Sequence, residues 1–288
     1  MLLQSPSLFI MIETYRHNSN EYILLPSHSQ WNETVQTNHE DEKPDNALAN
    51  IARLFDNSWL AAEQLITNTA NGRGKVYFFE AMEEKCVLRH YYRGGLAAKV
   101  SKDRFVYSSM QKTRAFREMS ILSLLFQAGL NVPKPLAARV VRTGACYTAD
   151  IITGEIEKAR ELHDILQTKP LDEPIWRAIG ESIRKMHNAQ AFHPDINVKN
   201  ILVELSKDGD VSSNVASLKQ HKSKISLLDF DSCKIRKGEA WKRENLARFK
   251  RSLDKQAKKH PEYHFEEKNW RWLEQGYTLS VIPAKAGI

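Results

Sequence analysis

Two short segments of the chain carry side chains that could do chemistry together. Residues 193–200 contain Asp195 and end in Asn200, directly before a short apolar run. Further along the chain, the apolar residues 225–228 lead directly into Asp229. Such runs are typical of buried strands, and a hairpin of the two would bring the polar residues at their ends close together. The pattern therefore predicts one polar site that contains Asp195, Asn200 and Asp229.

These residue types suit the transfer of a phosphoryl group from ATP to a hydroxyl. Such a reaction needs a carboxylate beside the acceptor hydroxyl, magnesium that bridges the phosphates, and cations near the developing charge. Asp195 would accept or orient the hydroxyl proton. Asn200 and Asp229 would hold Mg²⁺, because this ion prefers hard oxygen ligands. The alternative is purely structural: Asp195 would cap a turn, and Asn200 would be an ordinary loop residue.

A glycine-containing turn far upstream could bind the phosphates of ATP. Gly72 and Gly74 would let the backbone approach a phosphate closely, and Arg73 between them adds a positive charge. The turn precedes two predicted strands, over residues 76–80 and 86–91. An isolated Gly-x-Gly is a weak signal, and an ordinary hairpin turn explains it equally well.

Arg89, in the second of these strands, is a candidate phosphate-binding residue. Its guanidinium can bridge phosphate oxygens and pair with a carboxylate. Residues 113–129 have the apolar spacing of a helix, and Glu118 lies close to the apolar face, where a carboxylate needs a partner. We predict that Arg89 and Glu118 form this pair. The alternatives are an exposed strand arginine and a solvated carboxylate on the helix surface.

The elements that would position these residues divide the chain into two lobes. Residues 1–44 are mostly polar and predict a weakly ordered lead-in, or else a short first strand and turn. Residues 45–152 combine strand patterns with helices and form the first lobe. The break at residues 153–155 predicts a hinge, after which residues 153–279 form a mainly helical catalytic lobe and residues 280–288 a tail. The predicted fold class is α+β.

Composition narrows the classes of protein and partner. The 288 residues are 42% hydrophobic and 27% charged, which is ordinary for a globular protein. The net charge of +7 favours an anionic partner, such as nucleotide phosphates, a membrane surface or nucleic acid. Three widely spaced cysteines indicate a reducing compartment and no structural zinc. The apolar run of residues 8–12 is too short to span a membrane, so we expect a cytoplasmic protein, soluble or peripheral.

Together these motifs resemble those of a known family, the 3-deoxy-D-manno-octulosonic acid (Kdo) kinases of lipopolysaccharide core synthesis. These enzymes belong to the sugar kinases with a protein-kinase-like fold, alongside the core heptose kinases. The most distinctive part is the run Arg-His-Tyr-Tyr-Arg-Gly-Gly at residues 89–95, which ordinary protein kinases lack. The other segments that carry the resemblance are Gly72-Arg73-Gly74, residues 113–118, residues 193–200 and Asp229-Phe230-Asp231.

The resemblance implies ATP-dependent phosphorylation of the 4-hydroxyl of a Kdo residue on a lipid A precursor. By position it makes Asp195 the catalytic base, Asn200 and Asp229 the magnesium ligands, and Arg89 with Glu118 the pair that grips the phosphates.

The same resemblance implies a fold and cofactors. The fold has two lobes, the first an antiparallel sheet with a helix and the second mainly helical. The cofactors are ATP and Mg²⁺. The residues assigned to ATP are Gly72, Arg73, Gly74, Arg89 and Glu118.

The chain departs from the protein-kinase pattern at three positions. Pro194 follows His193 where protein kinases have arginine, Asn197 replaces the lysine of the catalytic loop, and Asp231 replaces the glycine of Asp-Phe-Gly. No Ala-Pro-Glu segment follows. These changes argue against control by a phosphorylated activation loop, and they favour a small-molecule or glycolipid acceptor over a protein.

A basic segment follows the candidate site. Residues 234–259 contain eleven Lys and Arg against three acids, and Trp241, Leu246, Phe249 and Leu253 give them an apolar side. A basic amphipathic helix can lie on an anionic membrane or hold a phosphorylated lipid A head group. It can equally pack on the second lobe with a solvated basic face. We expect a Kdo-lipid A precursor as partner, peripheral contact with the cytoplasmic face of the inner membrane, and no nucleic acid.

Two other functions stay open at this point. One is a kinase for another hydroxylated small molecule, such as a core heptose or an aminoglycoside. The other is a non-catalytic basic module that binds nucleic acid or membrane through an inactive kinase fold. The presence of Asp195, Asn200 and Asp229 together argues against the second alternative, because inactive kinase folds commonly lack at least one of these residues.

Overall fold

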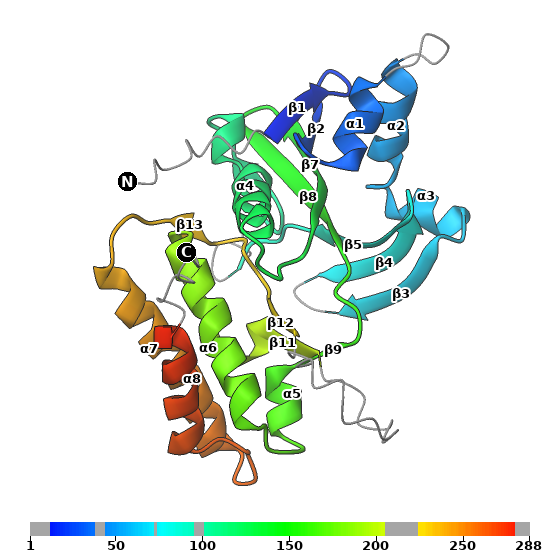
Figure 1. The fold of residues 1–288 in the computed structure, drawn as a ribbon. Helices are drawn as coiled ribbons and strands as arrows, with labels where there is room; N and C mark the ends of the chain where they lie inside the picture. Colours follow the sequence, from blue (N-terminus) through cyan, green and yellow to red (C-terminus); the bar gives the residue numbers. More distant parts are fainter. Residues whose placement is uncertain (1–11, 38–43, 72–73, 95–100, 205–223, 280–288) are drawn as a thin grey trace, which may run out of the picture. The chain divides into compact units, whose positions relative to one another are not determined.

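The chain forms two compact units in the computed structural model (Figure 1), which describes residues 12–37, 44–71, 74–94, 101–204 and 224–279. The first unit comprises Met1–Leu124 and Pro133–Glu155, and the second comprises Leu125–Val132 and Ile156–Ile288. Antiparallel strands and helices occur in both units, so the fold class is α+β, as predicted.

The first unit is built on an antiparallel sheet with the strand order β1-β2-β7-β8-β5-β4-β3, to which β6 adds beside β8. Met82 and Glu83 form a two-residue turn between β4 and β5 and take positive φ values of 49° and 61°, which matches the twist of a tight hairpin. The strands are β1 (Ile12–Arg16), β2 (Glu21–Pro26), β3 (Ile66–Asn71), β4 (Lys75–Ala81), β5 (Glu84–His90), β6 (Phe105–Val106), β7 (Pro135–Thr143) and β8 (Cys146–Gly154).

The N-terminal segment differs from its prediction as a weakly ordered lead-in. Strands β1 and β2 and helix α1 (Gln30–Gln36) are regular elements, and β2 pairs on both sides, with β1 and with β7. Leu24 and Leu25 of β2 are fully buried, and so is Trp31 of α1. The prediction was wrong because residues 12–37 bury most of their few apolar side chains, and composition does not show this. Residues 1–11 and 38–43 lie outside the described part of the chain.

Three helices of the first unit, α1, α2 (Pro44–Arg53) and α3 (Asn57–Ala62), pack with sheet residues in one hydrophobic core. Side-chain caps start two of them: Ser29 accepts from the Asn32 N–H at the start of α1, and Asp56 accepts from the Ser58 and Trp59 N–H groups at the start of α3. The core includes Trp31, Ile51, Leu54, Phe55, Leu60, Phe79, Leu88 and Ile152.

Helix α4 (Arg114–Gln127) matches the helix predicted over residues 113–129. The hydroxyl of Thr113 accepts from the Phe116 N–H at its start. At its end Gly129 takes a φ of 73°, and the Leu130 N–H donates to the Leu125 carbonyl, which satisfies a carbonyl of the last turn. Met119 of this helix is fully buried.

The second unit is mainly helical, and its described residues also form two small sheets and one 3₁₀ turn. Strand β11 pairs with β9 on one side and with β12 on the other, and β10 pairs with β13. The helices are α5 (Leu162–Leu166), α6 (Glu173–Asn188), α7 (Ala240–Lys259) and α8 (Glu267–Leu279). The strands are β9 (Ala159–Glu161), β10 (Ala191–Phe192), β11 (Ile201–Glu204), β12 (Lys224–Leu227) and β13 (Lys234–Ile235), and the 3₁₀ turn is η3 (Val198–Asn200).

Helices α6 and α8 lie side by side and approach each other at two glycines (Figure 1). A Cβ atom added to Gly180 would lie 2.0 Å from the carbonyl oxygen of Leu273, and one added to Gly276 would lie 2.1 Å from the carbonyl oxygen of Arg177. Both contacts are with backbone atoms, which cannot move aside like a flexible side chain. Glycine is therefore required at both positions for the two backbones to come this close.

Candidate active site

The strand pair β11–β12 brings the two predicted polar segments together. In this antiparallel pair Ile201 lies opposite Leu227, and the Leu228 N–H donates to the Asn200 carbonyl oxygen over 2.9 Å. Asn200 immediately precedes β11, and Asp229 follows β12 by two residues. The two residues therefore lie at the same end of the hairpin, with the segment that contains Asp195 leading into it.

The loop before β11 fixes the backbone of Asp195 and leaves its carboxylate accessible. The side-chain amides of Asn197 and Asn200 both donate to the Asp195 carbonyl oxygen, each over 2.9 Å. Asn197 also caps η3, because its Oδ1 accepts from the Lys199 N–H. The Asp195 side chain is 52% exposed. Since Asn200 uses its nitrogen to hold the loop, its Oδ1 is the atom that could bind a cation.

Asp229 occupies a turn in which an L-residue is uncommon. Its φ is 64°, in the left-handed region that Asp and Asn tolerate better than most residues. The side chain is exposed, whereas the next residue, Phe230, is almost completely buried and packs against the ring of His193 at 5.3 Å. The turn thus places an exposed carboxylate directly before a buried aromatic ring.

His193 ties the loop to the end of β12. Its Nε2 donates to the Leu228 carbonyl oxygen over 2.9 Å, and the ring is 2% exposed. Burial lowers the pKa of His193, so the ring is neutral near pH 7 and its role is to join the two polar segments.

Helix α7 holds the same loop from the side, a role that the sequence patterns did not reveal. Asn245 donates to the His193 carbonyl oxygen over 2.7 Å, and the hydroxyl of Ser252 accepts from the Val198 N–H over 3.1 Å. One nitrogen of the Arg248 guanidinium lies 3.4 Å from Oδ1 of Asp195. The only sequence signal was the spacing of these three polar residues, three and four positions apart, because this spacing places them along one side of a helix.

A second row of contacts extends this support to α6 and α8. The Tyr277 hydroxyl donates to Nδ1 of His187 over 2.7 Å, and Nε2 of His187 donates to Oδ1 of Asn245 over 3.0 Å. This chain of hydrogen bonds needs a neutral imidazole, because Nδ1 must accept. Burial lowers the pKa of His187 to about 4, which keeps the ring in that form at neutral pH.

In the first unit, the expected pair of Arg89 and Glu118 is present. A guanidinium nitrogen of Arg89 lies 2.6 Å from Oε1 of Glu118, and the hydroxyl of Tyr91 donates to Oε2 over 2.7 Å. Glu118 is 3% exposed, whereas the Arg89 side chain is 33% exposed. Both carboxylate oxygens of Glu118 are therefore held by hydrogen bonds, while part of the Arg89 side chain stays exposed.

The glycine turn is described only at its last residue. Gly72 and Arg73 lie outside the described residues, so their predicted contact with phosphate stays a prediction. A Cβ atom on Gly74 would lie 1.9 Å from the ring of Tyr92. The close approach of this aromatic ring is thus one reason for glycine at position 74, independent of any nucleotide.

Strand alternation divides the run at residues 89–95 between the two faces of the sheet. Arg89 lies opposite Ile151 in β8, and His90 lies opposite Asp150, so the two side chains point to opposite faces. His90 Nδ1 is 2.6 Å from one carboxylate oxygen of Asp150, and the guanidinium of Arg139 is 2.9 Å from the other. The sequence patterns predicted a role for Arg89 alone in this run and did not reveal the cluster around His90.

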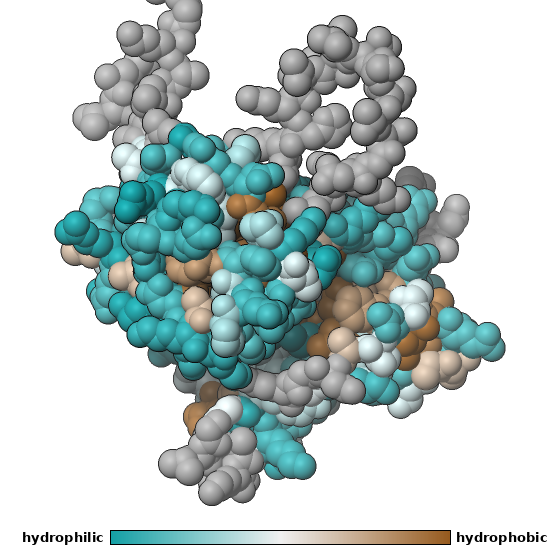
Figure 2. Space-filling model, turned by 90° about the horizontal axis from the view of Figure 1, so that it is seen from below, coloured by the Kyte–Doolittle hydropathy of each residue, from teal (hydrophilic) through white to brown (hydrophobic). Residues whose placement is uncertain are grey.

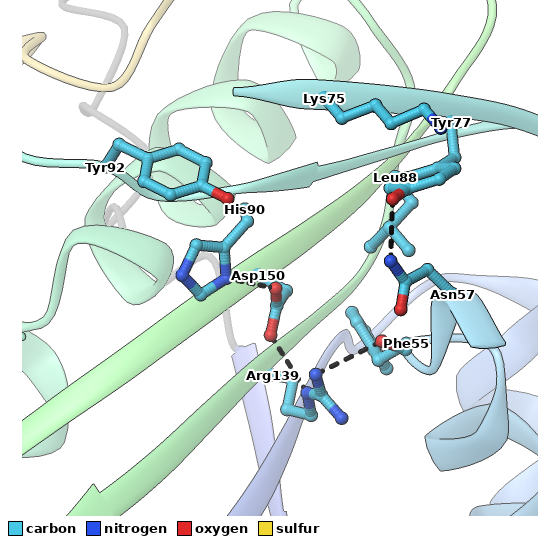
Figure 3. Close-up of a pocket in the computed structure, with 9 residues that line it drawn as sticks. All are labelled: Phe55, Asn57, Lys75, Tyr77, Leu88, His90, Tyr92, Arg139 and Asp150. Atoms are coloured by element: carbon cyan, nitrogen blue, oxygen red, sulfur yellow. Dashed lines mark hydrogen bonds and ion pairs between the residues drawn. The ribbon is translucent and has the colours of Figure 1, made fainter. Parts of the chain in front are cut away.

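The His90 cluster forms one wall of a cavity of about 230 Å³ in the first unit (Figure 3). Burial alone would lower the pKa of His90, but its hydrogen bonds and the charges of Asp150 and Asp103 outweigh this effect and raise the pKa. The other lining residues come from β4, β5 and the region of α3, and most of the polar groups shown bond to one another. The lining residues are Phe55, Asn57, Lys75, Tyr77, Leu88, His90, Tyr92, Arg139 and Asp150.

Comparison with known proteins identifies related sequences over most of the chain. A 3-deoxy-D-manno-octulosonic acid kinase of Haemophilus influenzae (strain PittEE) is 39% identical over 238 residues, which cover 81% of this chain and 93% of the relative. A 3-deoxy-D-manno-octulosonic acid kinase of Actinobacillus succinogenes is 41% identical over 229 residues, which cover 78% of this chain and 90% of the relative.

A solved structure shares the fold. The structure described as "WaaP in complex with acyl carrier protein" matches with a TM-score of 0.50 and 16% sequence identity, over 79% of this chain and 85% of that chain. In addition, the family described as "Lipopolysaccharide kinase (Kdo/WaaP) family" matches residues 57–277. The chain therefore belongs to the lipopolysaccharide kinase (Kdo/WaaP) family.

Proposed function

We propose that this chain is an ATP-dependent kinase that phosphorylates Kdo in the synthesis of the lipopolysaccharide core. The observation that carries the proposal is the hairpin β11–β12, which assembles Asp195, Asn200 and Asp229 in a chain that belongs to this kinase family. Relatives at 39–41% identity are Kdo kinases, which favours Kdo over a core heptose or an aminoglycoside as the acceptor.

Asp195 acts on the acceptor hydroxyl. Its carboxylate is exposed, and its backbone is fixed by two side-chain amides, so the group is both accessible and oriented. It accepts the hydroxyl proton as the oxygen attacks the terminal phosphorus of ATP, and the bond from that phosphorus to the bridging oxygen breaks to release ADP.

Asn200 and Asp229 suit a magnesium ion. Both offer hard oxygen atoms, and no hydrogen bond or ion pair within the described part of the chain engages Oδ1 of Asn200 or the Asp229 carboxylate. Magnesium is commonly held by one or two protein oxygens together with phosphates and water, which agrees with this small donor set. When bound, the ion neutralises charge on the phosphates.

Arg89 binds phosphate oxygens of ATP in the first unit. The buried carboxylate of Glu118 holds one nitrogen of its guanidinium, and the planar group has further N–H donors that can bind phosphate oxygens. The turn at residues 72–74 contributes backbone N–H groups in this proposal.

The acceptor is the 4-hydroxyl of a Kdo residue on a lipid A precursor at the cytoplasmic face of the inner membrane. Trp241, Phe249 and Leu253 of α7 are buried, so this helix packs on the second unit and keeps a solvated basic side. We call that side the basic stripe; it consists of Arg251, Lys255, Lys258 and Lys259, all exposed. These cations attract anionic lipid head groups without insertion of the helix. In the described residues, no helix is both long and apolar enough to cross a bilayer.

The test is a transfer assay with the purified full chain. Labelled ATP is supplied with a Kdo-lipid A precursor, and in parallel with a core heptose acceptor, and mass spectrometry identifies the product and the modified hydroxyl. We expect one added phosphate on Kdo only. Transfer to the heptose acceptor alone would contradict the Kdo assignment.

Asp195→Asn tests the mechanism in the same assay. The change preserves shape but removes the proton acceptor, and we expect kcat to fall by about 10²–10⁴-fold. The matched control is Asp164→Asn, at an exposed position of α5 in the same unit, which should keep wild-type turnover. Near-normal turnover in Asp195→Asn would exclude Asp195 as the base.

A further inference from the structure

Arg248 occupies a special position beside the proposed catalytic carboxylate. It belongs to α7, far along the chain from the loop, and its guanidinium lies 3.4 Å from Oδ1 of Asp195. The side chains are 49% and 52% exposed, so solvent screens their attraction. An exposed ion pair of this kind contributes only about 0–1 kcal/mol to stability, which gives little structural reason for the contact.

The neighbours of Arg248 hold its backbone close to the loop. Asn245, three residues earlier, bonds to the His193 carbonyl, and Ser252, four residues later, bonds to the Val198 N–H. Residues at these spacings lie on one side of an α-helix. The backbone of Arg248 is thus held between two anchors, and its side chain reaches Asp195 from there.

The loop itself supplies no cation at Asp195 among the residues that the structure describes. Asn197 uses both ends of its amide, one on the Asp195 carbonyl and one on the Lys199 N–H. The charge of Lys199 acts on Glu161 and His163 of the neighbouring β9 and α5 region. Arg248 is the cation in contact with the carboxylate.

We propose that Arg248 is a catalytic residue that binds the transferring phosphoryl group while it holds the Asp195 carboxylate in place. This inference rests on the proposed phosphoryl transfer. A guanidinium has several N–H donors in one plane, so it can donate to a carboxylate and to phosphoryl oxygens at the same time. As the bond to ADP breaks and the bond to the acceptor oxygen forms, Arg248 stabilises the charge on the phosphoryl oxygens, and the hydroxyl proton passes to Asp195.

The test compares Arg248→Gln with Arg248→Lys and with a matched control, Arg243→Gln. Arg243 is an exposed arginine of the same helix, and five residues at about 100° each place it about 140° away from Arg248 around the axis. Steady-state kinetics with ATP and the Kdo acceptor should show kcat lowered by about 10²-fold or more in Arg248→Gln. KM for either substrate should change by less than about threefold, because the contact is made mainly in the transition state.

The two other variants sharpen the result. Arg248→Lys should recover part of kcat, because it restores the charge without the planar donor geometry, and Arg243→Gln should match the wild type. Thermal unfolding should be the same in all three variants. Equal kcat in Arg248→Gln and Arg243→Gln would overturn the role of Arg248, and so would a loss that appears only in KM.

A second measurement separates this inference from the proposed function. The affinity for ADP with aluminium fluoride, which mimics the transferring phosphoryl group, is measured by calorimetry without any acceptor. Arg248→Gln should lower this affinity at least tenfold while ADP alone binds as in the wild type. If the wild type binds the analogue but transfers no phosphate to Kdo, the assignment of Kdo as acceptor is refuted and the role of Arg248 is not. Equal affinity in the wild type and Arg248→Gln, or no binding by either, would overturn the role of Arg248.

Discussion

At the scale of single residues, one carboxylate of the first unit positions two side chains. Glu118 accepts from Arg89 and from Tyr91, and the ring of Tyr91 lies 5.1 Å from the Arg89 guanidinium carbon. Burial raises the pKa of Tyr91, and the charge of Glu118 raises it further, so the phenol stays protonated as a donor. A buried charge is tolerated only with such partners. The cluster therefore sets the position of the Arg89 head group.

Glu118→Gln tests this arrangement, since it keeps the shape and removes the charge. Hydrogen bonds to a charged acceptor become neutral ones, and we expect the free energy of unfolding to fall by about 1–3 kcal/mol in a urea titration. KM for ATP should rise about tenfold, because Arg89 is no longer held. Glu80→Gln, at an exposed position of β4, should change neither value. An unchanged KM for ATP in Glu118→Gln would show that the pair of Arg89 and Glu118 does not contribute to nucleotide binding.

His187 makes the stability of the second unit depend on pH. Its folded pKa of about 4 lies below the unfolded value of 6.5, so the unfolded chain binds more protons between these two pH values. Stability is therefore fully present above pH 6.5 and falls as the pH drops towards 4, by up to about 3 kcal/mol.

A histidine-selective NMR titration measures this pKa directly. The His187 ring should stay neutral until about pH 4. Asn245→Asp places a carboxylate beside Nε2 and should raise that pKa, since a negative charge favours the imidazolium. A His187 ring that titrates near 6.5 in the wild type would contradict the neutral hydrogen-bond chain from Tyr277 to His193.

At the scale of elements, the candidate catalytic loop depends on the packing of three helices. The side chains of α7 hold the loop, His187 of α6 holds Asn245 of α7, and Tyr277 of α8 holds His187. The distance between α6 and α8 therefore sets the geometry of the loop indirectly. That distance depends on Gly180 and Gly276, where the two backbones touch.

Gly180→Ala should destabilise the second unit. Alanine normally stabilises an exposed helix position by about 1 kcal/mol relative to glycine, but here its Cβ would collide with the backbone of α8. We expect the free energy of unfolding to fall by about 3 kcal/mol, with a lower kcat because the loop loses its support. Lys185→Ala, exposed on the same helix, should shift stability by less than about 0.5 kcal/mol. A stabilised Gly180→Ala variant would show that the helices can separate at no cost.

At the scale of the whole molecule, the surface is marked by positive charge more than by hydrophobic patches. The chain has a net charge of +7, and the described surface on the face in Figure 2 is mostly hydrophilic, with hydrophobic residues in smaller patches. Large hydrophobic side chains that are strongly exposed are few among the described residues: Val106, Phe126 and Ile235. Recognition of an anionic glycolipid by the basic stripe agrees with this distribution better than insertion of an apolar face.

The triple variant Arg251→Gln, Lys255→Gln and Lys258→Gln tests the basic stripe. Each cation contributes about 1 kcal/mol near an anionic surface, so binding to vesicles that contain phosphatidylglycerol should fall by about two orders of magnitude in a sedimentation assay. KM for the glycolipid should rise, and KM for ATP should not.

The control for the stripe removes the same charge elsewhere in the second unit. Lys169→Gln, Lys237→Gln and Arg243→Gln combine three exposed positions outside the stripe. If this control lost as much vesicle binding as the first triple variant, net charge and not the stripe would be responsible. High salt should lower the vesicle binding of the wild type towards that of the stripe variant, because salt screens exposed charges.

Sequence periodicity by itself determined which residues sit at the ends of which elements. Apolar runs of strand length directly after Asn200 and directly before Asp229 were enough to predict the hairpin that brings them together. The helical spacing around Glu118 was enough to place its carboxylate among buried side chains and to suggest Arg89 as its partner. These inferences succeed because side-chain direction repeats with the local geometry of strand and helix.

Only the tertiary structure decided which distant elements meet. The contact of Arg248 with Asp195 joins positions 53 residues apart, and no local repeat encodes it. The same holds for the hydrogen-bond chain from Tyr277 to His193, and for the pairing of β2 with β7, a strand more distant in the sequence. Local patterns determine which face of an element is apolar, whereas the partner of that face depends on the packing of the whole chain.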